Sequence, residues 1–494
     1  MKILVFCSSS LLKPQLGIQL EEAENYALQG NDVKFVYCKK CMNACSYNLY
    51  KSSLICNYCQ NEYKRMINKK WHFSFVELIE NANKKKHVFK YNCIDDIKRI
   101  IYKELEIGYA CLSSYISATR NPEPTIDDKF RNTFDCLLEN TCKLTNHIED
   151  LLKKENPDKV FVYNGRLHDT YPVMQLCKKY NISFVCTEVN KFGTEYYKQY
   201  FENDIPHSPE IRCKQIYNYW ETDSISLEEK TNIGKSFFQK RKNRESTNDK
   251  VYTKKQVSNL LPSDFDRNKR NYVIFNSSED ELASLGSEFA KKNLFKSQLE
   301  GIKYILDITK SLNNIHFYLR IHPNLAGLPF SYHTDLYKLS KYENITIIPP
   351  TAKIDSYAIM DACEKVIVFT SSMGIESVYW GKPVIVLGNT FYSSLKGFYK
   401  PENINLVKDL LLDDLKPMTN EDAIKYGYYL LRKNPEQRTR HINIDIYRLN
   451  IFGRVFETCN YQKRWNSRAI FSVFNLIILS WDRLIVKMKN KWRF

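Results

Sequence analysis

The chain has 494 residues, of which 43% are hydrophobic and 26% are charged, so its composition is that of a globular protein and excludes a largely disordered one. A chain of this length is too long to fold around a single hydrophobic core, so two or three domains are predicted. The 73 Lys and Arg residues outnumber the 56 Asp and Glu residues, which gives a net charge of +17. This excess favours an anionic partner such as a nucleotide, a phospholipid surface or a nucleic acid.

The first 235 residues are predicted to form a Rossmann-like α/β domain. A buried strand at 2–7, a helix at 15–30 and a strand at 32–38 begin it, and residues 148–188 repeat the alternation of helix and strand. The five-residue apolar run near the start is too short for a secretory signal. Together with an odd number of cysteines, 15, this predicts a cytoplasmic protein whose thiols are free or bound to metal.

Five of these cysteines lie within 22 residues, in a predicted insertion at 38–59. Two Cys-x2-Cys pairs separated by 14 residues fit a structural, tetrahedral Zn²⁺ site. Five thiols compete for four ligand positions: Cys38, Cys56 and Cys59 are joined by either Cys45 or Cys41, and the residues alone leave that choice open. A group of free thiols is the other interpretation. Because the basic residues are scattered and no groove-reading motif follows, nucleic-acid binding is not expected.

Residues 236–270 are polar, basic and aperiodic, as is typical of an interdomain linker or a basic loop. The alternation then resumes, and residues 271–420 predict a second Rossmann-like domain. Its strands are expected at 271–275, 316–321, 345–350, 365–369 and 382–387. The predicted fold class is therefore α/β, of the GT-B type, with two doubly wound domains facing a cleft.

Helices are predicted for residues 421–494 after the second domain. Within them, the apolar stretch 469–481 is shorter than the about 18–20 residues of a membrane-spanning helix, and basic residues follow it. It fits a helix at the membrane interface or a helix packed back on the first domain.

Polar loops follow three predicted strands of the second domain, at residues 276–279, 322–324 and 370–372. Ligands of open α/β sheets bind at the carboxyl ends of the strands, so these loops predict one binding crevice. Ser371 or Ser372 would cap the next helix, and Gly374 would let its backbone approach an anion.

Two more side chains complete this predicted anion site. Glu376 lies one helical turn after Ser372 and would accept hydrogen bonds from sugar hydroxyls. His322 would donate to a phosphate oxygen. Capping, packing and solvation are the competing roles of these residue types.

Residues 274–400 resemble GT-B glycosyltransferases of bacterial capsule and surface-polysaccharide synthesis, through segments such as LRIHPNL (319–325) and FTSSMGIESVYWGKPVIVLG (369–388). The "NGR" loop within 162–188 is similar to one in the same proteins. The His-Pro and Ser-Ser pairs are also similar to those of GT-B sialyltransferases and Kdo transferases, which use CMP-sugars. By this resemblance, His322, Pro323, Ser371 and Ser372 contact the donor nucleotide. The predicted donor site also includes the neighbouring Ser277, Ser278, Glu279, Asn324, Gly374 and Glu376.

The catalytic base is not assigned by a motif, because the Asp/Glu-Asp-Gly motif of one sialyltransferase group is missing from the sequence. Candidates from the first domain are Asp169, Glu188 and His168. Asn164 and Arg166 are predicted to position the acceptor or a phosphate. Hydrogen bonding within loops is the alternative role for all five residues.

The predicted function is transfer of a sugar from a nucleotide donor, with a CMP-sugar favoured, to a surface-polysaccharide or lipid-linked glycan acceptor. The reaction is expected to be inverting, to need no cofactor, and to take place in the cytoplasm at the inner membrane surface. The alternatives are a CDP-glycerol-type polyol-phosphate transferase, a UDP-sugar 2-epimerase and a non-catalytic nucleotide-binding partner in polysaccharide assembly.

Overall fold

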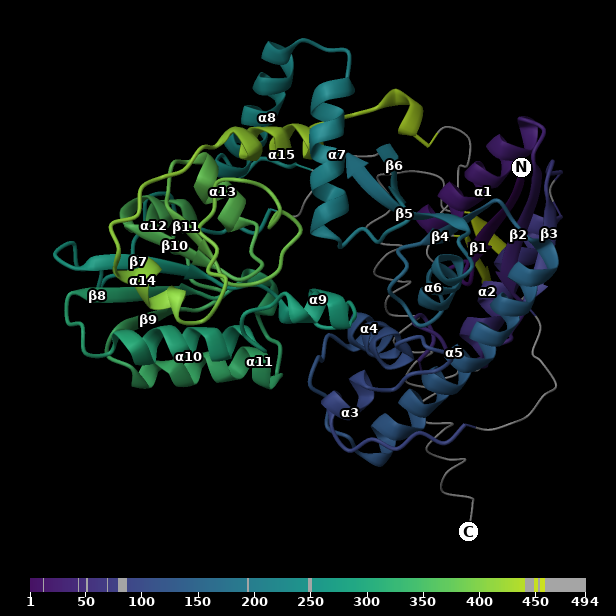
Figure 1. Cartoon of the computed structure of the whole chain (residues 1–494), viewed down its shortest axis with the longest axis horizontal. Coiled ribbons are helices and arrows are strands. Elements are labelled where there is room, and N and C mark those ends of the chain that lie inside the picture. Colours follow the sequence, from purple (N-terminus) through teal and green to yellow (C-terminus); the bar gives the residue numbers. More distant parts are fainter. Residues whose placement is uncertain are drawn as a thin grey trace. The chain divides into compact units, whose positions relative to one another are not determined.

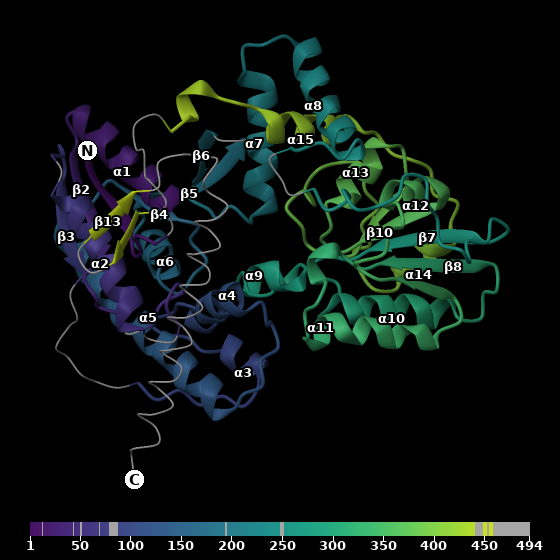
Figure 2. The same ribbon diagram turned by 180° about the vertical axis from the view of Figure 1, so that it is seen from behind.

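The computed structural model describes residues 1–11, 13–42, 44–49, 52–68, 70–78, 87–192, 195–247, 251–439, 448–451 and 454–457. These residues form two compact units, whose helices and strands are seen from opposite sides in Figures 1 and 2. Met1–Val88 and Arg131–Val189 make the first unit, together with the described residues after Arg438. Phe89–Phe130 and Asn190–Arg438 make the second.

The first unit is built on parallel strands in the order β3-β2-β1-β4-β5. Its strands are β1 (Lys2–Cys7), β2 (Asp32–Cys38), β3 (Ser74–Leu78), β4 (Lys159–Tyr163), β5 (Ser183–Phe192), β12 (Arg448–Ile451) and β13 (Arg454–Glu457). Its helices are α1 (Lys13–Leu28), α2 (Ser53–Ile67), α5 (Asp128–Glu155) and α6 (Tyr171–Lys179). The central strand β1 is buried from Ile3 to Cys7, as its short apolar run predicts.

The second unit contains most of the remaining elements. Its strands are β6 (Glu195–Glu202), β7 (Arg270–Phe275), β8 (Ile315–Arg320), β9 (Ile345–Ile348), β10 (Lys365–Val368) and β11 (Val384–Val386). Its α-helices are α3 (Ile94–Lys98), α4 (Ile107–Thr119), α7 (Pro209–Thr222), α8 (Leu227–Lys242), α9 (Ser287–Lys291), α10 (Gln298–Thr309), α11 (Ser331–Thr334), α12 (Ser356–Ala362), α13 (Met373–Tyr379), α14 (Leu406–Leu412) and α15 (Glu421–Leu431). Its 3-10 helices are η1 (Glu279–Glu281), η2 (Pro323–Leu325), η3 (Asp335–Lys341) and η4 (Pro435–Gln437).

The sheet of the second unit has the order β11-β10-β7-β8-β9, and all its strands are parallel. Successive residues of a strand face opposite sides, so Val273 and Phe275 pack in one core with residues of α8, α12, α13 and α15. Tyr272 and Ile274 pack in the other core with residues of α10 and α14. Helices therefore cover both faces of the sheet. The prediction of an α/β chain with two parallel-sheet domains is confirmed.

The predicted domain boundaries differ from the observed units. Residues 89–130 and 190–235 fall in the second unit, although the prediction placed them in the first domain. Helices α7 and α8 pack on α15, where Gly234 and Gly427 bring two helix backbones together. A Cβ atom on Gly427 would lie 2.4 Å from the carbonyl oxygen of Gly234. Tertiary packing between distant segments therefore decides these boundaries.

The interpretation of residues 236–270 as a linker is wrong for the described part of that segment. Residues 236–242 belong to α8. Further on, the Val257 N–H donates to the carbonyl of Lys353 at 2.8 Å, and Gln256 exchanges two hydrogen bonds with Ser356. The segment is thus an integral part of the second unit.

The described part of the C-terminal segment is only partly helical. The prediction of helices after residue 420 holds for α15, whereas Arg448–Ile451 and Arg454–Glu457 pair as antiparallel strands. The apolar stretch 469–481 lies outside the described residues. Within the described part of the chain, no helix has the length and apolar character needed to cross a membrane.

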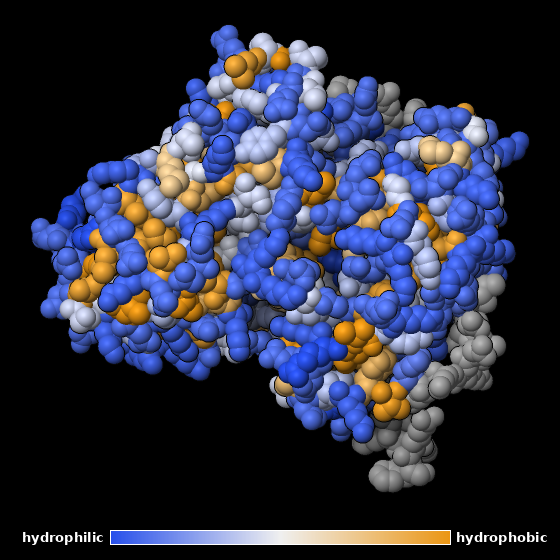
Figure 3. All heavy atoms as spheres, in the orientation of Figure 1, coloured by the Kyte–Doolittle hydropathy of each residue, from blue (hydrophilic) through white to orange (hydrophobic). Residues whose placement is uncertain are grey.

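Figure 3 shows a mostly hydrophilic surface with hydrophobic patches, one of them over the part of the second unit where Figure 1 places α14. Ile404, Leu406 and Leu412 are among the exposed apolar residues of that region. Apolar residues exposed in this way are ordinary for a folded protein.

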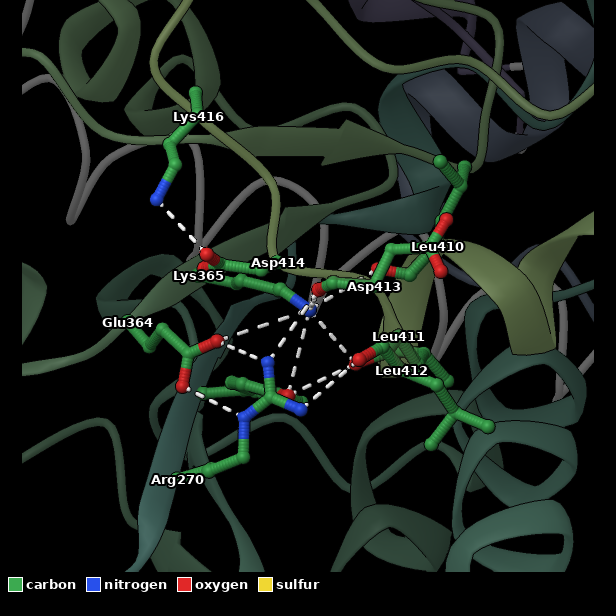
Figure 4. Close-up of polar contacts among 10 residues, drawn as sticks. Arg270, Glu364, Lys365, Leu410, Leu411, Leu412, Asp413, Asp414 and Lys416 are labelled. Carbon is green, nitrogen blue, oxygen red and sulfur yellow. Dashed lines mark hydrogen bonds and ion pairs between the residues drawn. The ribbon is translucent and has the colours of Figure 1, made fainter.

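A buried lysine holds the C-terminal end of α14 against the sheet (Figure 4). The Nζ atom of Lys365 donates to the carbonyl oxygens of Leu410 at 3.2 Å, Leu411 at 2.7 Å and Asp413. Because carbonyl groups at a helix end lack partners within the helix, this ammonium group supplies donors that the helix needs. Burial lowers the pKa of Lys365 to about 8.

We expect Lys365→Met to lower the free energy of unfolding by about 1–3 kcal/mol at neutral pH, because buried carbonyl groups lose their donor. The folded pKa of Lys365 lies below its unfolded value, so unfolding takes up a proton between about pH 8 and pH 10 and wild-type stability rises with pH there. Urea unfolding of both proteins across this range should therefore show a stability difference that grows with pH. A constant difference would contradict the lowered pKa.

Candidate functional site

Three loops of the second unit meet at the carboxyl edge of its sheet. β7 lies between β10 and β8, and Phe275 pairs in register with Val368 on one side and Arg320 on the other. The residues that follow these strands line one cavity of about 450 Å³, which we call the first cavity. The predicted crevice at loops 276–279, 322–324 and 370–372 is thus present in the structure.

Three arginines that the sequence analysis did not single out line the first cavity: Arg212 of α7, Arg241 of α8 and Arg320 at the end of β8. Arg320 is buried and donates to the carbonyl oxygens of Pro349 and Ala352. Burial lowers its pKa to about 10, so it remains charged at neutral pH. These guanidinium groups give the cavity the positive charge that an anionic ligand needs.

His322 lines the first cavity, and a hydrogen bond determines which ring nitrogen of its neutral form carries the proton. Its Nδ1 atom accepts a hydrogen bond from the N–H of Asn324 at 3.1 Å, so the neutral ring carries its proton on Nε2. Its own N–H donates to Asn276 Oδ1 at 2.8 Å, and Tyr252 contacts the ring edge-on at 4.8 Å between centroids. Nε2–H is therefore the ring donor of the neutral His322, and its contact with an anion stays a prediction.

The Ser371-Ser372 pair lines the same cavity; Ser372 is the N-cap residue of α13 but its side chain makes no capping hydrogen bond, and Ser371 bonds to the first turn instead. Its Oγ atom accepts a hydrogen bond from the N–H of Met373 at 3.4 Å. The structure explains the glycine at 374 differently from the prediction. A Cβ atom there would lie 2.3 Å from the hydroxyl oxygen of Tyr392, and Gly374 is not among the residues that line the first cavity. The absence of a side chain at Gly374 thus serves packing against Tyr392.

Glu376 is fully buried and supports a cavity residue without lining the cavity itself. Its Oε1 atom lies 2.8 Å from Arg241 Nε, and the hydroxyl of Tyr357 donates to its Oε2 atom. Ser372 Oγ donates to Oε1 at 3.4 Å, so Ser372 and Glu376 share one helical face as predicted. This geometry favours a role in holding Arg241 over the predicted contact with sugar hydroxyls.

The other predicted donor residues divide into two groups. Ser277, Ser278 and Pro323 line the first cavity. The side chain of Asn324 contacts Ser278 Oγ at 3.4 Å, and Glu279 lines a different cavity.

The predicted catalytic residues of the first unit gather at the carboxyl edge of its sheet. Ser8, after β1, donates to Asp169 Oδ2, and His168 Nδ1 lies 3.7 Å from Asp169 Oδ1. All three are buried, and burial lowers the pKa of His168. Asp169 lines a small cavity of about 20 Å³ with Tyr47 and Tyr163.

Asn164 and Glu188 form a direct pair, in which Asn164 Nδ2 donates to Glu188 Oε1. Asn164 has a φ of 58°, a left-handed conformation that Asn tolerates better than most residues. Arg166 is near enough to Tyr163 for its charge to act on the Tyr163 pKa, which burial raises overall. The structure thus groups these residues, while their catalytic or acceptor roles remain predictions.

The five clustered cysteines lie close together in the first unit. The Sγ atoms of Cys38 and Cys41 are 3.5 Å apart. Burial is the main cause that raises the pKa values of Cys45, Cys56 and Cys59, and the charge of Cys38 adds to each shift. Within the described ranges, however, no three Cys, His, Asp or Glu side chains are placed as a metal-ligand set. The zinc site stays a prediction.

That prediction has a direct test in the metal content of the purified protein. We expect about one zinc ion per chain by elemental mass spectrometry, and much less in a Cys56→Ser, Cys59→Ser double variant. Cys363→Ser, which alters a buried thiol of the second unit, is the matched control and should keep its zinc. Zinc-free wild-type protein with five alkylatable thiols in this cluster would contradict the prediction.

Comparison with protein families gives a match that lies within the second unit. Residues 234–402 match the family described as "Capsule polysaccharide biosynthesis protein". No curated protein sequence matches the chain.

Similar solved structures include two transferases of KpsC from Thermosulfurimonas dismutans. The beta Kdo 2,4 transferase is 12% identical with a TM-score of 0.35, covering 55% of this chain and 80% of its own. The beta Kdo 2,7 transferase is 15% identical with a TM-score of 0.33, covering 67% and 89%. A UDP-GlcNAc 2-epimerase from Methanocaldococcus jannaschii is 14% identical with a TM-score of 0.27, covering 87% and 99%. Such low values carry no information on substrate.

The family match covers residues that line the first cavity. Residues 234–402 include Arg241, His322 and the Ser371-Ser372 pair, and all of these line the first cavity. The resemblance to capsule polysaccharide biosynthesis proteins is therefore confirmed for the segment that carries the His-Pro and Ser-Ser loops.

Proposed function

We propose that the chain is a glycosyltransferase that moves a sugar from a nucleotide donor to a surface-polysaccharide or lipid-linked glycan. The observation that carries the proposal is the first cavity, which Arg212, Arg241 and His322 line together with the Ser371-Ser372 pair. Its volume of about 450 Å³ is in the range of small-molecule sites. Its location, at the carboxyl edge of a parallel sheet, is where such folds bind ligands.

The proposed chemistry follows from the charge of the first cavity. When the bond between the anomeric carbon and the donor phosphate breaks, its electron pair leaves with the nucleotide. Arginines and the Nε2–H of His322 would stabilise that negative charge, and we infer that these hydrogen-bond donors and the charge of the arginines make a catalytic metal unnecessary. Asp169, Glu188 and His168 remain the candidates for deprotonating the acceptor hydroxyl, with inversion at the sugar.

The donor is proposed to be a CMP-sugar, on the His-Pro and Ser-Ser resemblance. Thermal shifts with CMP, CDP, UDP, GDP and dTDP test this directly. A nucleotide at about 100 times its Kd adds roughly 2.7 kcal/mol of stability to the complex. We expect one nucleotide to act selectively and His322→Ala to reduce its effect. No shift with any nucleotide would contradict the proposal, and a selective CDP shift with glycerophosphate transfer would favour the polyol-phosphate alternative.

The proposed acceptor is attached to, or presented at, the inner membrane surface. The net charge of +17 supports attraction to anionic lipids. Sedimentation with vesicles containing about 30% phosphatidylserine, compared with neutral vesicles, tests this part of the proposal. Binding that is equal for both vesicles, or lost for both, would contradict it.

A further inference from the structure

A second cavity of about 480 Å³ lies next to the first in the second unit. The two share Thr370 as a lining residue, and Thr370 Oγ1 contacts Ser277 Oγ, which lines the first cavity. Gln298 lines the second cavity, and its Oε1 atom accepts a hydrogen bond from the N–H of Ser277 at 2.9 Å. Any ligands of the two cavities would therefore be neighbours.

Residues of α3 and α4 form the other side of the second cavity, and hydrogen bonds hold them there. Ser284 Oγ donates to the carbonyl of Tyr109 at 2.7 Å, and the N–H of Ser287 donates to Glu106 Oε2 at 3.0 Å. Arg120, at the end of α4, lies 2.9 Å from Asp280. In Figures 1 and 2, α4 lies beside α9 in both views. The second cavity is thus a formed feature of one unit.

The lining of the second cavity combines apolar rings with a few hydrogen-bonding groups. Phe289, Phe295 and Leu112 supply apolar surface, and Glu279 and Asn389 supply polar groups. Asn389 is 6% exposed, and its Nδ2 atom has no hydrogen-bond partner among the residues that the structure describes, whereas its Oδ1 atom accepts from Ser393. A buried amide donor without a partner costs stability, which indicates that a ligand oxygen completes the site.

Glu279 is one of three carboxylates that line this cavity. Its Oε1 atom accepts from the N–H of Gln298, at the start of α10. Burial raises its pKa to about 7, and the charges of Glu123 and Asp280 add to the shift, while the hydrogen bond from Gln298 opposes it. Glu123, Asp95, Lys98 and Lys296 also line the cavity.

The carboxylates distinguish the ligand of the second cavity from that of the first. The three carboxylates of Asp95, Glu123 and Glu279 outnumber the ammonium groups of Lys98 and Lys296, so this lining disfavours a phosphate, which the arginines of the first cavity attract. A sugar ring instead offers C–H surface to an aromatic ring and hydroxyl groups to a carboxylate or an amide.

We propose that the second cavity binds a neutral sugar residue of the glycan acceptor. One sugar hydroxyl donates to the Glu279 carboxylate, the Asn389 amide donates to a sugar oxygen, and the ring packs on Phe289. The assignment of this sugar to the acceptor rests on the proposed glycosyltransferase function. The binding of a sugar does not depend on that function.

Saturation-transfer NMR with the methyl glycosides of glucose, galactose, rhamnose and N-acetylglucosamine tests the proposal. We expect at least one glycoside to bind the full-length protein, and Glu279→Gln to weaken its binding about 10- to 100-fold, as for hydrogen bonds to charged groups. Glu300→Gln, on the exposed first turn of α10, is the matched control and should bind like the wild type. Phe289→Ala, which removes the packing surface, should also weaken binding.

The pH dependence gives a second readout. If the ionised Glu279 binds the hydroxyl, affinity should rise about tenfold from pH 6 to pH 8, because the ionised fraction rises by that factor around a pKa of about 7. Glu279→Gln should show no such rise.

The proposal is overturned if no glycoside of the panel binds, or if the glycoside binds Glu279→Gln, Phe289→Ala and the wild type equally. Nucleotide thermal shifts measured in parallel separate the two proposals. Nucleotide binding without sugar binding rejects the second cavity alone, and sugar binding without nucleotide binding rejects the transferase function alone.

Discussion

Arg241→Met is expected to weaken nucleotide binding about 10- to 150-fold, which is the effect of losing charge-assisted hydrogen bonds worth about 1.5–3 kcal/mol. Arg241 lines the first cavity, and its Nη2 atom lies 3.5 Å from Ser372 Oγ. Isothermal titration with the nucleotide that gives the selective thermal shift measures the change. Lys235→Met removes one positive charge from an exposed position of the same helix and should leave the affinity within about twofold.

The same substitution also leaves Glu376 buried without its cation, which destabilises proteins by about 3–5 kcal/mol. An Arg241→Met, Glu376→Gln double variant separates the two effects. We expect it to recover most of the unfolding free energy and none of the nucleotide affinity. Recovery of the affinity would show that Arg241 acts only through folding and does not contact the ligand.

Gly427→Leu is expected to destabilise the second unit by roughly 3 kcal/mol or more, at or beyond the upper end of ordinary overpacking. Its Cβ atom would meet the carbonyl oxygen of Gly234 at 2.4 Å and the ring of Phe238 at 2.9 Å, and a backbone carbonyl has little room to move. Because α8 carries Arg241, the nucleotide thermal shift should disappear as well. Urea unfolding and thermal shifts measure both effects.

Two further variants make the Gly427 prediction specific. Gly427→Ala should have a smaller effect of the same sign, because it adds one carbon where Leu adds four. Glu421→Leu, at an exposed position of α15, should change the unfolding free energy by less than about 1 kcal/mol. Equal stability of Gly427→Leu and the wild type would show that the backbones of α8 and α15 are not in contact at Gly234 and Gly427.

The strands and the three loops of the first cavity were predictable because local patterns determine them. Buried parallel strands are short apolar runs, as at β1 and β7, and the residues after them meet at one edge of the sheet. Arg212 and Arg241 were not predictable, since they come from helices whose place in the second unit depends on packing against α15. Arg241 itself stood in a basic segment that resembled a linker.

The roles of Glu376 and Gly374 could not be predicted either, because both depend on contacts with residues distant in the sequence. Glu376 looks like a solvated helix residue until Arg241, at a separation of 135 residues, is placed beside it. Gly374 looks like a ligand-binding glycine until Tyr392 fills the space above it. In the same way, the second cavity joins residues of 93–123 to residues of 279–389, and no local pattern links these segments.

The division of the second unit into two stretches of chain has a consequence during synthesis. Glu106 at the start of α4 hydrogen-bonds to Ser287, a residue 181 positions later. At a translation rate of about 5–20 residues per second, roughly 10–35 s pass between the synthesis of α4 and the synthesis of Ser287. During that interval the side chains that α4 buries in the folded protein, which include Ile107, Leu112 and Ile116, lack part of their native packing partners. Helix α4 is therefore a natural binding target for chaperones on the nascent chain.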